Sequence, residues 1–108
     1  MPDRVRRVQE YIERNIERRL TTAELAQVAH LSPYHFTRCL KKITGKTPQQ
    51  LVMNARASCA KERLRQGFTI VLVACMCGFA SQSHMTNVLK KQVGSTPAQF
   101  QRNISPEE

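Results

Sequence analysis

The sequence SPYHFTRCLKKITGKTP, at residues 32–48, decides the fold, because a second version of it, SQSHMTNVLKKQVGSTP, follows at residues 81–97. The copies share a first Ser, a His, a Lys pair, a Gly and a final Thr-Pro. Each has the features of one complete helix: a Ser that can cap the N-terminus, cations that suit the C-terminal end of the helix dipole, and a Gly for the left-handed residue that follows. The Thr-Pro predicts the start of another helix.

Apolar residues recur at helical spacing within each copy, which predicts one inward face on each helix. They are Phe36, Cys39, Leu40 and Ile43 in the first copy, and Met85, Val88, Leu89 and Val93 in the second. The other faces are polar, so both helices are expected to be amphipathic.

A short apolar helix is expected before each copy, over residues 23–30 and residues 70–77. Leu31 and Phe79 then fill equivalent turns, and the second turn is one residue longer than the first. A short helix, a tight turn and a second helix that begins with polar side chains make a helix-turn-helix unit. The sequence therefore predicts two such units.

Three further helices complete the predicted chain. Residues 4–19 form an amphipathic helix with Val5, Val8, Ile12, Ile16 and Leu20 on one stripe, and we interpret it as scaffold. Residues 48–66 have neither Gly nor a second Pro and form a long helix that ends at Gly67. A last short helix begins at Thr96-Pro97.

The charge is uneven along the 108 residues, which are enough for one compact domain or two small subdomains that share a helix. There are 17 Lys and Arg against 8 Asp and Glu, and residues 20–106 have only Glu24 and Glu62 as acids. Such an excess indicates a polyanionic partner, either a nucleic acid or an anionic membrane surface.

No stretch has the features of a secretory signal or a membrane span. The chain is charged from Asp3 onward, and its longest apolar run, Ile70–Cys77, is far shorter than the roughly 20 residues that a spanning helix needs. We therefore expect a cytoplasmic protein without membrane contact, in which Cys39, Cys59, Cys75 and Cys77 are reduced thiols.

The outward side chains in the first turns of the two repeated helices suit base recognition, because a helix in the major groove reads base edges from its N-terminal end. Arg38 can donate two hydrogen bonds to guanine, and Gln82 or Asn87 can bond adenine. The candidate base-reading residues are Tyr34, Thr37, Arg38, Gln82, Ser83, Thr86 and Asn87. Lysines that fit phosphate contacts are Lys41, Lys42, Lys46, Lys90 and Lys91.

The helix over residues 48–66 would separate the two units by about 28 Å at ~1.5 Å per residue. That length is near one turn of duplex DNA, about 34 Å. Two units held so far apart could reach neighbouring major grooves.

The strings LTTAELAQVAHLSPYHFTRCLKKITGKTPQQL and FTIVLVACMCGFASQSHMTNVLKKQVGSTPAQF carry a specific resemblance. Over about residues 5–102 the chain resembles the DNA-binding domain of the AraC/XylS family of bacterial transcription regulators. The resemblance implies an all-α fold of seven helices over residues 1–108. It also implies two helix-turn-helix subdomains, residues 4–47 and 67–102, joined by a linker helix at residues 48–66.

The resemblance also implies a function: two recognition helices that enter successive major grooves of double-stranded DNA, and activation by recruitment of RNA polymerase. It implies the base-reading set given above, and it makes Arg56 a phosphate-proximal or packing residue. Many members have an N-terminal effector or dimerisation domain, and others stand alone. Asn87 departs from the family, where many members have Arg, so the second helix is expected to read its site more weakly or differently.

Enzyme chemistry is not expected. His30, His35 and His84 form no catalytic set with a Ser or Asp, and no Gly-rich phosphate loop occurs, so we expect neither catalytic residues nor a cofactor. A metal site from Cys75, Cys77 and His84 is disfavoured, because residues two apart on a helix point in roughly opposite directions.

Two alternatives remain open at this point. The chain could be a basic accessory protein that coats DNA or RNA through phosphates alone, or a thiol or metal sensor that uses its cysteines. The apolar residues Val71, Leu72, Cys75 and Met76 are also expected to lie partly outward. They would then meet polymerase, a companion domain or a dimer mate, or else be covered by a neighbouring helix.

Overall fold

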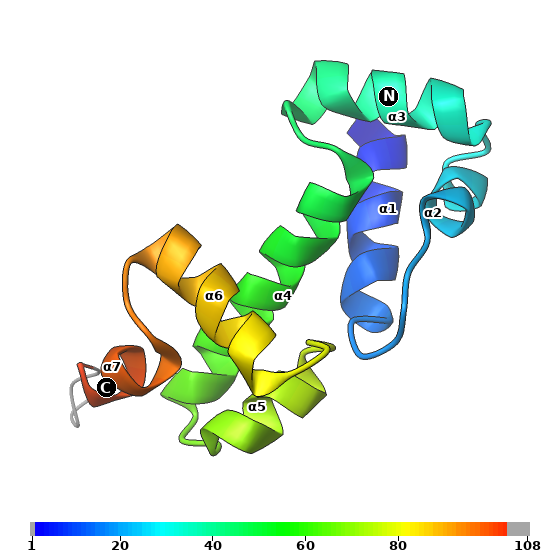
Figure 1. Ribbon diagram of the computed structural model, residues 1–108. Helices are drawn as coiled ribbons and strands as arrows, with labels where there is room; N and C mark the ends of the chain where they lie inside the picture. The colour runs from blue at the N-terminus through cyan, green and yellow to red at the C-terminus, as the bar shows by residue number, and fades with distance from the viewer. Residues whose placement is uncertain (1, 104–108) are drawn as a thin grey trace. The chain divides into compact units, whose positions relative to one another are not determined.

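The computed structural model describes residues 2–103, and the described part is all-α with seven helices (Figure 1). In chain order these are α1 (Pro2–Arg14), α2 (Thr22–Val28), α3 (Pro33–Thr44), α4 (Pro48–Arg65), α5 (Ile70–Met76), α6 (Gln82–Val93) and α7 (Pro97–Arg102). The chain divides between Ala55 and Arg56, within α4, into two compact units. The expected all-α fold of seven helices is confirmed.

Serine caps begin the repeated helices and left-handed glycines end them, as expected. The amide of His35 donates to Ser32 Oγ over 3.2 Å at the start of α3, and the amide of His84 donates to Ser81 Oγ over 3.0 Å at the start of α6. A left-handed glycine follows each helix, with φ of 76° at Gly45 and 83° at Gly94. The two copies are therefore two equally capped helices of 12 residues each.

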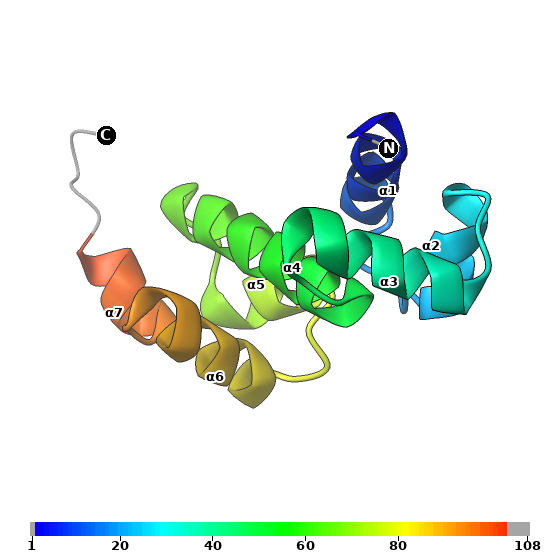
Figure 2. The same ribbon diagram turned by 90° about the horizontal axis from the view of Figure 1, so that it is seen from above.

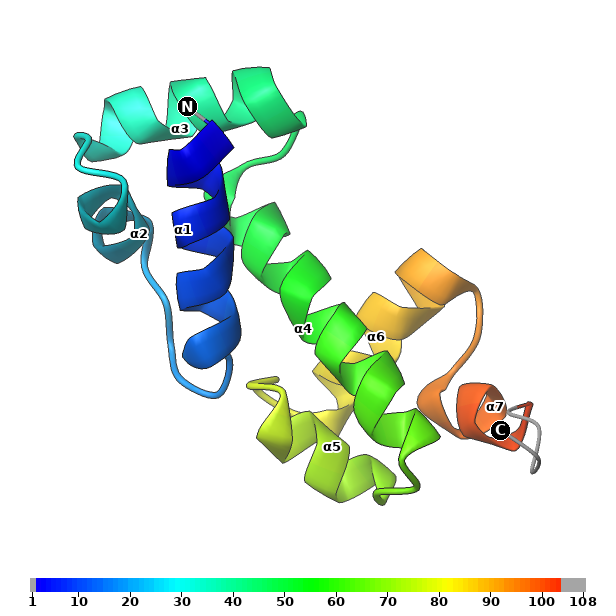
Figure 3. The same ribbon diagram turned by 180° about the vertical axis from the view of Figure 1, so that it is seen from behind.

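The first unit packs α1, α2, α3 and the first part of α4 around one core. Figures 1 and 3 show α2 beside α1, with α3 crossing near the N-terminal end of α1. The turn from α2 to α3 is closed by a hydrogen bond from the Leu31 amide to the Ala26 carbonyl, at 3.0 Å. The buried residues are Val8, Ile12, Leu20, Leu25, Ala26, Ala29, Phe36, Leu40, Leu51 and Val52.

The second unit packs α5, α6 and α7 against the rest of α4, as the view from above shows (Figure 2). Gln101 anchors α7, because its Nε2 donates to the carbonyls of Leu64 and Phe68 over 3.2 and 2.9 Å. The buried residues are Ala57, Ala60, Leu64, Val73, Ala74, Cys77, Phe79, Met85 and Leu89.

The helix expected over residues 4–19 ends early, at Arg14. Asn15 explains why the helix ends there. Its side-chain Nδ2 donates to the carbonyl oxygen of Tyr11 over 2.8 Å, and its backbone N–H donates to the carbonyl oxygens of Tyr11 and Ile12. Asn competes in this way with the helical backbone bonds. The chain then turns back, which brings Arg18 towards α2.

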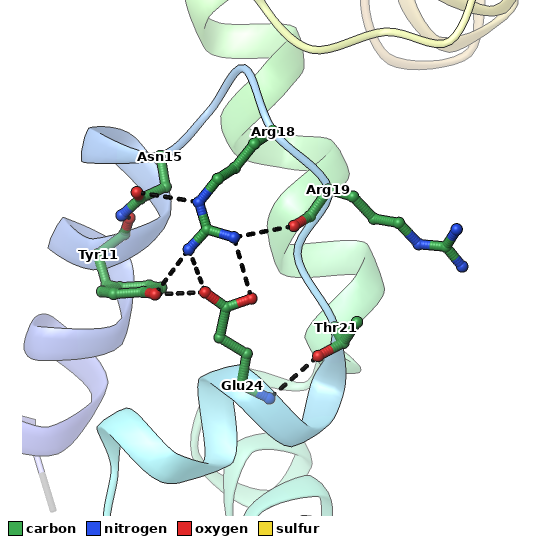
Figure 4. A network of polar contacts seen from close by, with 6 residues as sticks. All are labelled: Tyr11, Asn15, Arg18, Arg19, Thr21 and Glu24. Carbon is green, nitrogen blue, oxygen red and sulfur yellow. Dashed lines mark hydrogen bonds and ion pairs between the residues drawn. The ribbon is translucent and has the colours of Figure 1, made fainter.

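Arg18 joins the end of α1 to the start of α2 through a polar network (Figure 4). Its guanidinium pairs with the Glu24 carboxylate and donates to the Tyr11 hydroxyl over 2.7 Å, and the Tyr11 hydroxyl donates to Glu24. Arg18 Nε also donates to Asn15 Oδ1 over 3.2 Å. The hydrogen bond from Arg18 lowers the pKa of Glu24, and the hydrogen bond to Glu24 raises the pKa of Tyr11.

Burial differs from the expected pattern at the ends of the repeated helices. Ile43 and Val93 are 48% and 38% exposed, because each lies in a last turn, just before the chain leaves the core at a glycine. In α4 the buried positions include the small residues Ala57 and Ala60. The outward orientation expected for Val71 and Leu72 is confirmed, at 68% and 45% exposed.

None of the helices between residues 2 and 103 combines the length and the apolar character that crossing a lipid bilayer requires.

Candidate nucleic-acid interface

The first candidate reading surface is the exposed face of α3. Tyr34 and Arg38 are exposed, whereas Thr37, between them in sequence, is half-buried. The three residues lie in the first half of a helix that begins at a capped N-terminus. Its amide groups provide a further site for anions such as phosphate.

Tyr34 and Arg38 contact each other on this face. Arg38 Nη1 donates to the Tyr34 hydroxyl oxygen over 3.1 Å, and the guanidinium carbon lies 5.6 Å from the centre of the Tyr34 ring. From the sequence, Tyr34 and Arg38 were predicted to contact DNA bases independently, and the contact between them was not predicted. Their separation by four residues was the available signal, because such residues are neighbours on a helix surface.

The second candidate surface is the first half of α6. Gln82, Ser83 and Asn87 are exposed, and Thr86 is half-buried. The Thr86 hydroxyl donates to the backbone carbonyl of Gln82 over 3.0 Å. The Thr86 hydroxyl proton is therefore used within α6, whereas its oxygen can still accept a hydrogen bond. Gln82, Ser83 and Asn87 are the more exposed candidates on this helix.

The candidate phosphate-binding residues differ in exposure. Lysines at the C-terminal ends of α3 and α6 are exposed, namely Lys41, Lys42, Lys90 and Lys91. Lys46, in the loop after α3, is half-buried. Arg56 on α4 is half-buried too, and its burial lowers the pKa of its guanidinium from the usual value. The phosphate and the packing alternatives for Arg56 both stay predictions.

The histidines at equivalent repeat positions have different surroundings. His84 is half-buried and its ring meets the edge of Phe79, with centroids 5.6 Å apart and planes at 81°. His35 is exposed. Within the described residues, no three His, Cys, Asp or Glu side chains gather as a metal site would require. His84 thus packs against the turn that leads into α6.

A family model described as a helix-turn-helix domain matches residues 25–103, which include both repeats and the helix between them. The chain belongs to the AraC-type helix-turn-helix family. The expected resemblance is thereby confirmed, and the chain is an AraC-type helix-turn-helix DNA-binding domain.

Among solved structures, the chain is similar to an AraC-type transcriptional regulator from Chromobacterium violaceum, with a TM-score of 0.91, 23% identity, and coverage of 99% of this chain and 96% of that one. This match supports the fold. It is also similar to the DNA-binding domain of AdpA, solved in complex with a target DNA, with a TM-score of 0.81, 26% identity, and coverage of 88% and 86%.

Among curated proteins, the chain is 41% identical over 68 residues to the bifunctional transcriptional activator/DNA repair enzyme AdaA of Bacillus subtilis (strain 168). That match covers 61% of this chain and 32% of AdaA. The chain spans about a third of the length of the curated relatives it matches.

Proposed function

We propose that this AraC-type domain binds a specific sequence in double-stranded DNA and serves as the DNA-binding part of a transcription regulator. In this proposal α3 and α6 enter successive major grooves. The observation that carries it is the exposed pair Tyr34 and Arg38 in the first half of α3, next to a capped N-terminus. An arginine so presented suits bidentate contact with guanine O6 and N7.

We assign base contacts and phosphate contacts to different residues according to their side-chain chemistry. Base edges are read by Tyr34, Thr37, Arg38, Gln82, Ser83, Thr86 and Asn87. Phosphates are bound by Lys41, Lys42, Lys46, Arg56, Lys90 and Lys91. The proposed subdomains are residues 4–47 and 67–102, joined by the linker helix at residues 48–66. Because each subdomain would contact its own part of the DNA site, the proposal predicts a site with two sequence elements about one helical turn of DNA apart.

The proposed role in the cell is activation of transcription in the cytoplasm, through recruitment of RNA polymerase to a promoter. AdaA, a relative of this chain, is described as a transcriptional activator. Because the chain spans only about a third of its curated relatives, an effector or dimerisation domain in a longer protein is part of the same proposal. Transcription from a promoter with the selected site, with and without the protein, tests the activation.

Selection of bound sites from random duplex DNA tests whether the domain recognises a specific base sequence. We expect a preferred site with two elements. Arg38→Ala should weaken binding to that site by about 1–3 kcal/mol and relax the base preference at one position of one element. Asn87→Ala should relax a position in the other element.

Lys41→Ala is the matched control, since Lys41 lies one turn further along the exposed face of α3. It should weaken binding about equally on all sequences and lower the salt dependence by about one ion. If Arg38→Ala behaved as Lys41→Ala does, the excess of basic residues would instead mark a protein that coats nucleic acid through its phosphates.

A further inference from the structure

Two cysteines from different helices meet in the second unit. Cys59 lies on α4 and Cys77 directly follows α5, and their sulfur atoms are 2.8 Å apart, with the Cys77 thiol directed at Cys59 Sγ. Cys77 is fully buried in the core of this unit, whereas Cys59 is half-buried at its edge. Both are thiols in the structure.

The sulfurs are close to bonding distance. A disulfide joins its sulfurs at about 2.05 Å, so the two atoms need to approach by only about 0.8 Å more. We propose that Cys59 and Cys77 are a redox modification site, which closes into an intramolecular disulfide in the presence of a hydroperoxide and reopens with a thiol reductant.

The reaction begins at Cys59, because it is the partner that solvent reaches. Its thiolate attacks one oxygen of hydrogen peroxide, the O–O bond breaks, and hydroxide leaves, so that Cys59 becomes a sulfenic acid. The Cys77 sulfur then attacks Cys59 Sγ, the S–O bond breaks, and the oxygen leaves as water. Overall, two thiols and one peroxide give one disulfide and two waters, with two electrons passed from sulfur to peroxide.

The other two cysteines are not suited to this bond. Cys39 lies on α3 in the first unit, and Cys75 is exposed on α5. Residues two apart on a helix point in roughly opposite directions, so Cys75 and Cys77 do not share a face. Cys75 and Cys39 therefore supply matched control positions in the same chain.

The disulfide would tie α4 to the start of the turn before α6. Phe79, two residues after Cys77, is buried in that turn, bonds through its amide to the Ala74 carbonyl over 3.0 Å, and meets the ring of His84 on α6. Because the sulfurs already touch, the bond should preserve this arrangement and stabilise it. Oxidation should thus make the second unit more resistant to unfolding, whatever ligand α6 binds.

The test uses the 108-residue chain with Cys39→Ser and Cys75→Ser, in which only Cys59 and Cys77 can react. After peroxide treatment we expect a monomer that has lost two hydrogens by intact mass, and a peptide map that joins Cys59 to Cys77. The melting temperature should rise by about 10 °C, since closing a loop of this length restricts the unfolded chain. Dithiothreitol should reverse both changes.

The control retains Cys39 and Cys75 and has Cys59→Ser, which alters the half-buried partner and leaves the core residue Cys77 in place. Peroxide should then leave the melting temperature unchanged. The proposal is overturned by any of three results in the two-cysteine chain: a disulfide-linked dimer, Cys59 oxidised to a sulfinic acid with Cys77 still a thiol, or an internal disulfide that lowers the melting temperature.

Discussion

Arg38 Nη1 lies 3.1 Å from the hydroxyl oxygen of Tyr34, one helical turn earlier on the exposed face of α3. The contact gives a long, exposed guanidinium a partner on its own helix. Ordering a flexible side chain in advance reduces the entropy that binding would otherwise cost. In the second repeat the equivalent residues are Ser83 and Asn87, so the two leading faces differ in chemistry as well as in sequence.

We therefore expect Tyr34→Phe to weaken binding to the selected DNA site, although the ring remains. The loss should be about 0.5–1.5 kcal/mol, the usual contribution of one hydrogen bond. Titration of labelled duplex gives the Kd. In the Arg38→Ala background the same change should have little further effect, because the bond no longer exists. Equal losses in both backgrounds would mean that Tyr34 acts independently of Arg38.

His30 and Gly78 occupy the same place in the two turns, and both have left-handed backbone, with φ of 59° and 80°. A side chain with a β-carbon is strained there, most of all a β-branched one. His30→Val should destabilise the chain by about 1–2 kcal/mol, whereas His30→Gly should stabilise it by up to about 1 kcal/mol. Urea unfolding measures both.

A glycine in ordinary helical backbone provides the control for this prediction. Gln27→Gly, at an exposed position in α2, should destabilise by about 1 kcal/mol, opposite in sign to His30→Gly. If both glycine variants lost stability equally, the backbone at His30 would not be strained.

The network of Tyr11, Arg18 and Glu24 predicts a dependence of stability on pH. Because Arg18 holds the pKa of Glu24 below its ordinary value of 4.5, the folded state binds fewer protons at Glu24 than the unfolded state does. Its contribution is present above pH 4.5 and is lost as the pH falls through the lowered pKa. Glu24→Gln should remove that part of the acid sensitivity, measured by urea unfolding across the acidic range.

Glu13→Gln is a suitable comparison for Glu24→Gln, since Glu13 is an exposed carboxylate on α1. It should leave the acid limb of the stability profile close to that of the unaltered chain. A profile unchanged by Glu24→Gln would show that the ion pair adds nothing in solution.

Leu40 and Ile43 test the difference between a buried and an exposed position on one helix. Leu40 is 2% exposed and Ile43 is 48% exposed, although both have apolar side chains at helical spacing. Leu40→Ala should destabilise by about 2–5 kcal/mol through the cavity it leaves, and Ile43→Ala by less than about 1 kcal/mol. Thermal unfolding followed by circular dichroism compares them, and similar losses would contradict the burial of α3.

Much of the fold could be predicted because its signals are local. Ser32 and Ser81 act on amides three residues away, and Gly45 and Gly94 allow left-handed backbone where they stand. The end of α1 was predicted wrongly, because it depends on contacts that the apolar pattern does not show. The apolar stripe of residues 4–19 continues past Arg14, but the Asn15 side chain competes for the backbone and the turn is completed by a contact with Glu24.

For the candidate site, the sequence predicted which side chains are exposed but not which contacts they make. Residue type and helical position selected Tyr34, Arg38, Gln82 and Asn87, which are exposed. Nothing in the spacing showed that the Thr86 hydroxyl bonds its own helix, or that Arg56 is half-buried. Rotamers and partial burial depend on neighbours that periodicity does not describe.

By itself the sequence determined the two capped helices, the order of the seven helices and the family, because caps, turns and repeats are encoded within a few residues of where they act. Only the tertiary structure decided that Cys59 meets Cys77, that Arg18 closes onto Tyr11 and Glu24, and that Ala57 and Ala60 lie in the core. Cys59 and Cys77 are 18 residues apart in the chain, Arg18 meets its partners only after the chain turns back at the end of α1, and Ala57 and Ala60 lie on faces of α4 that spacing does not distinguish. Packing against a specific neighbour is what selects them.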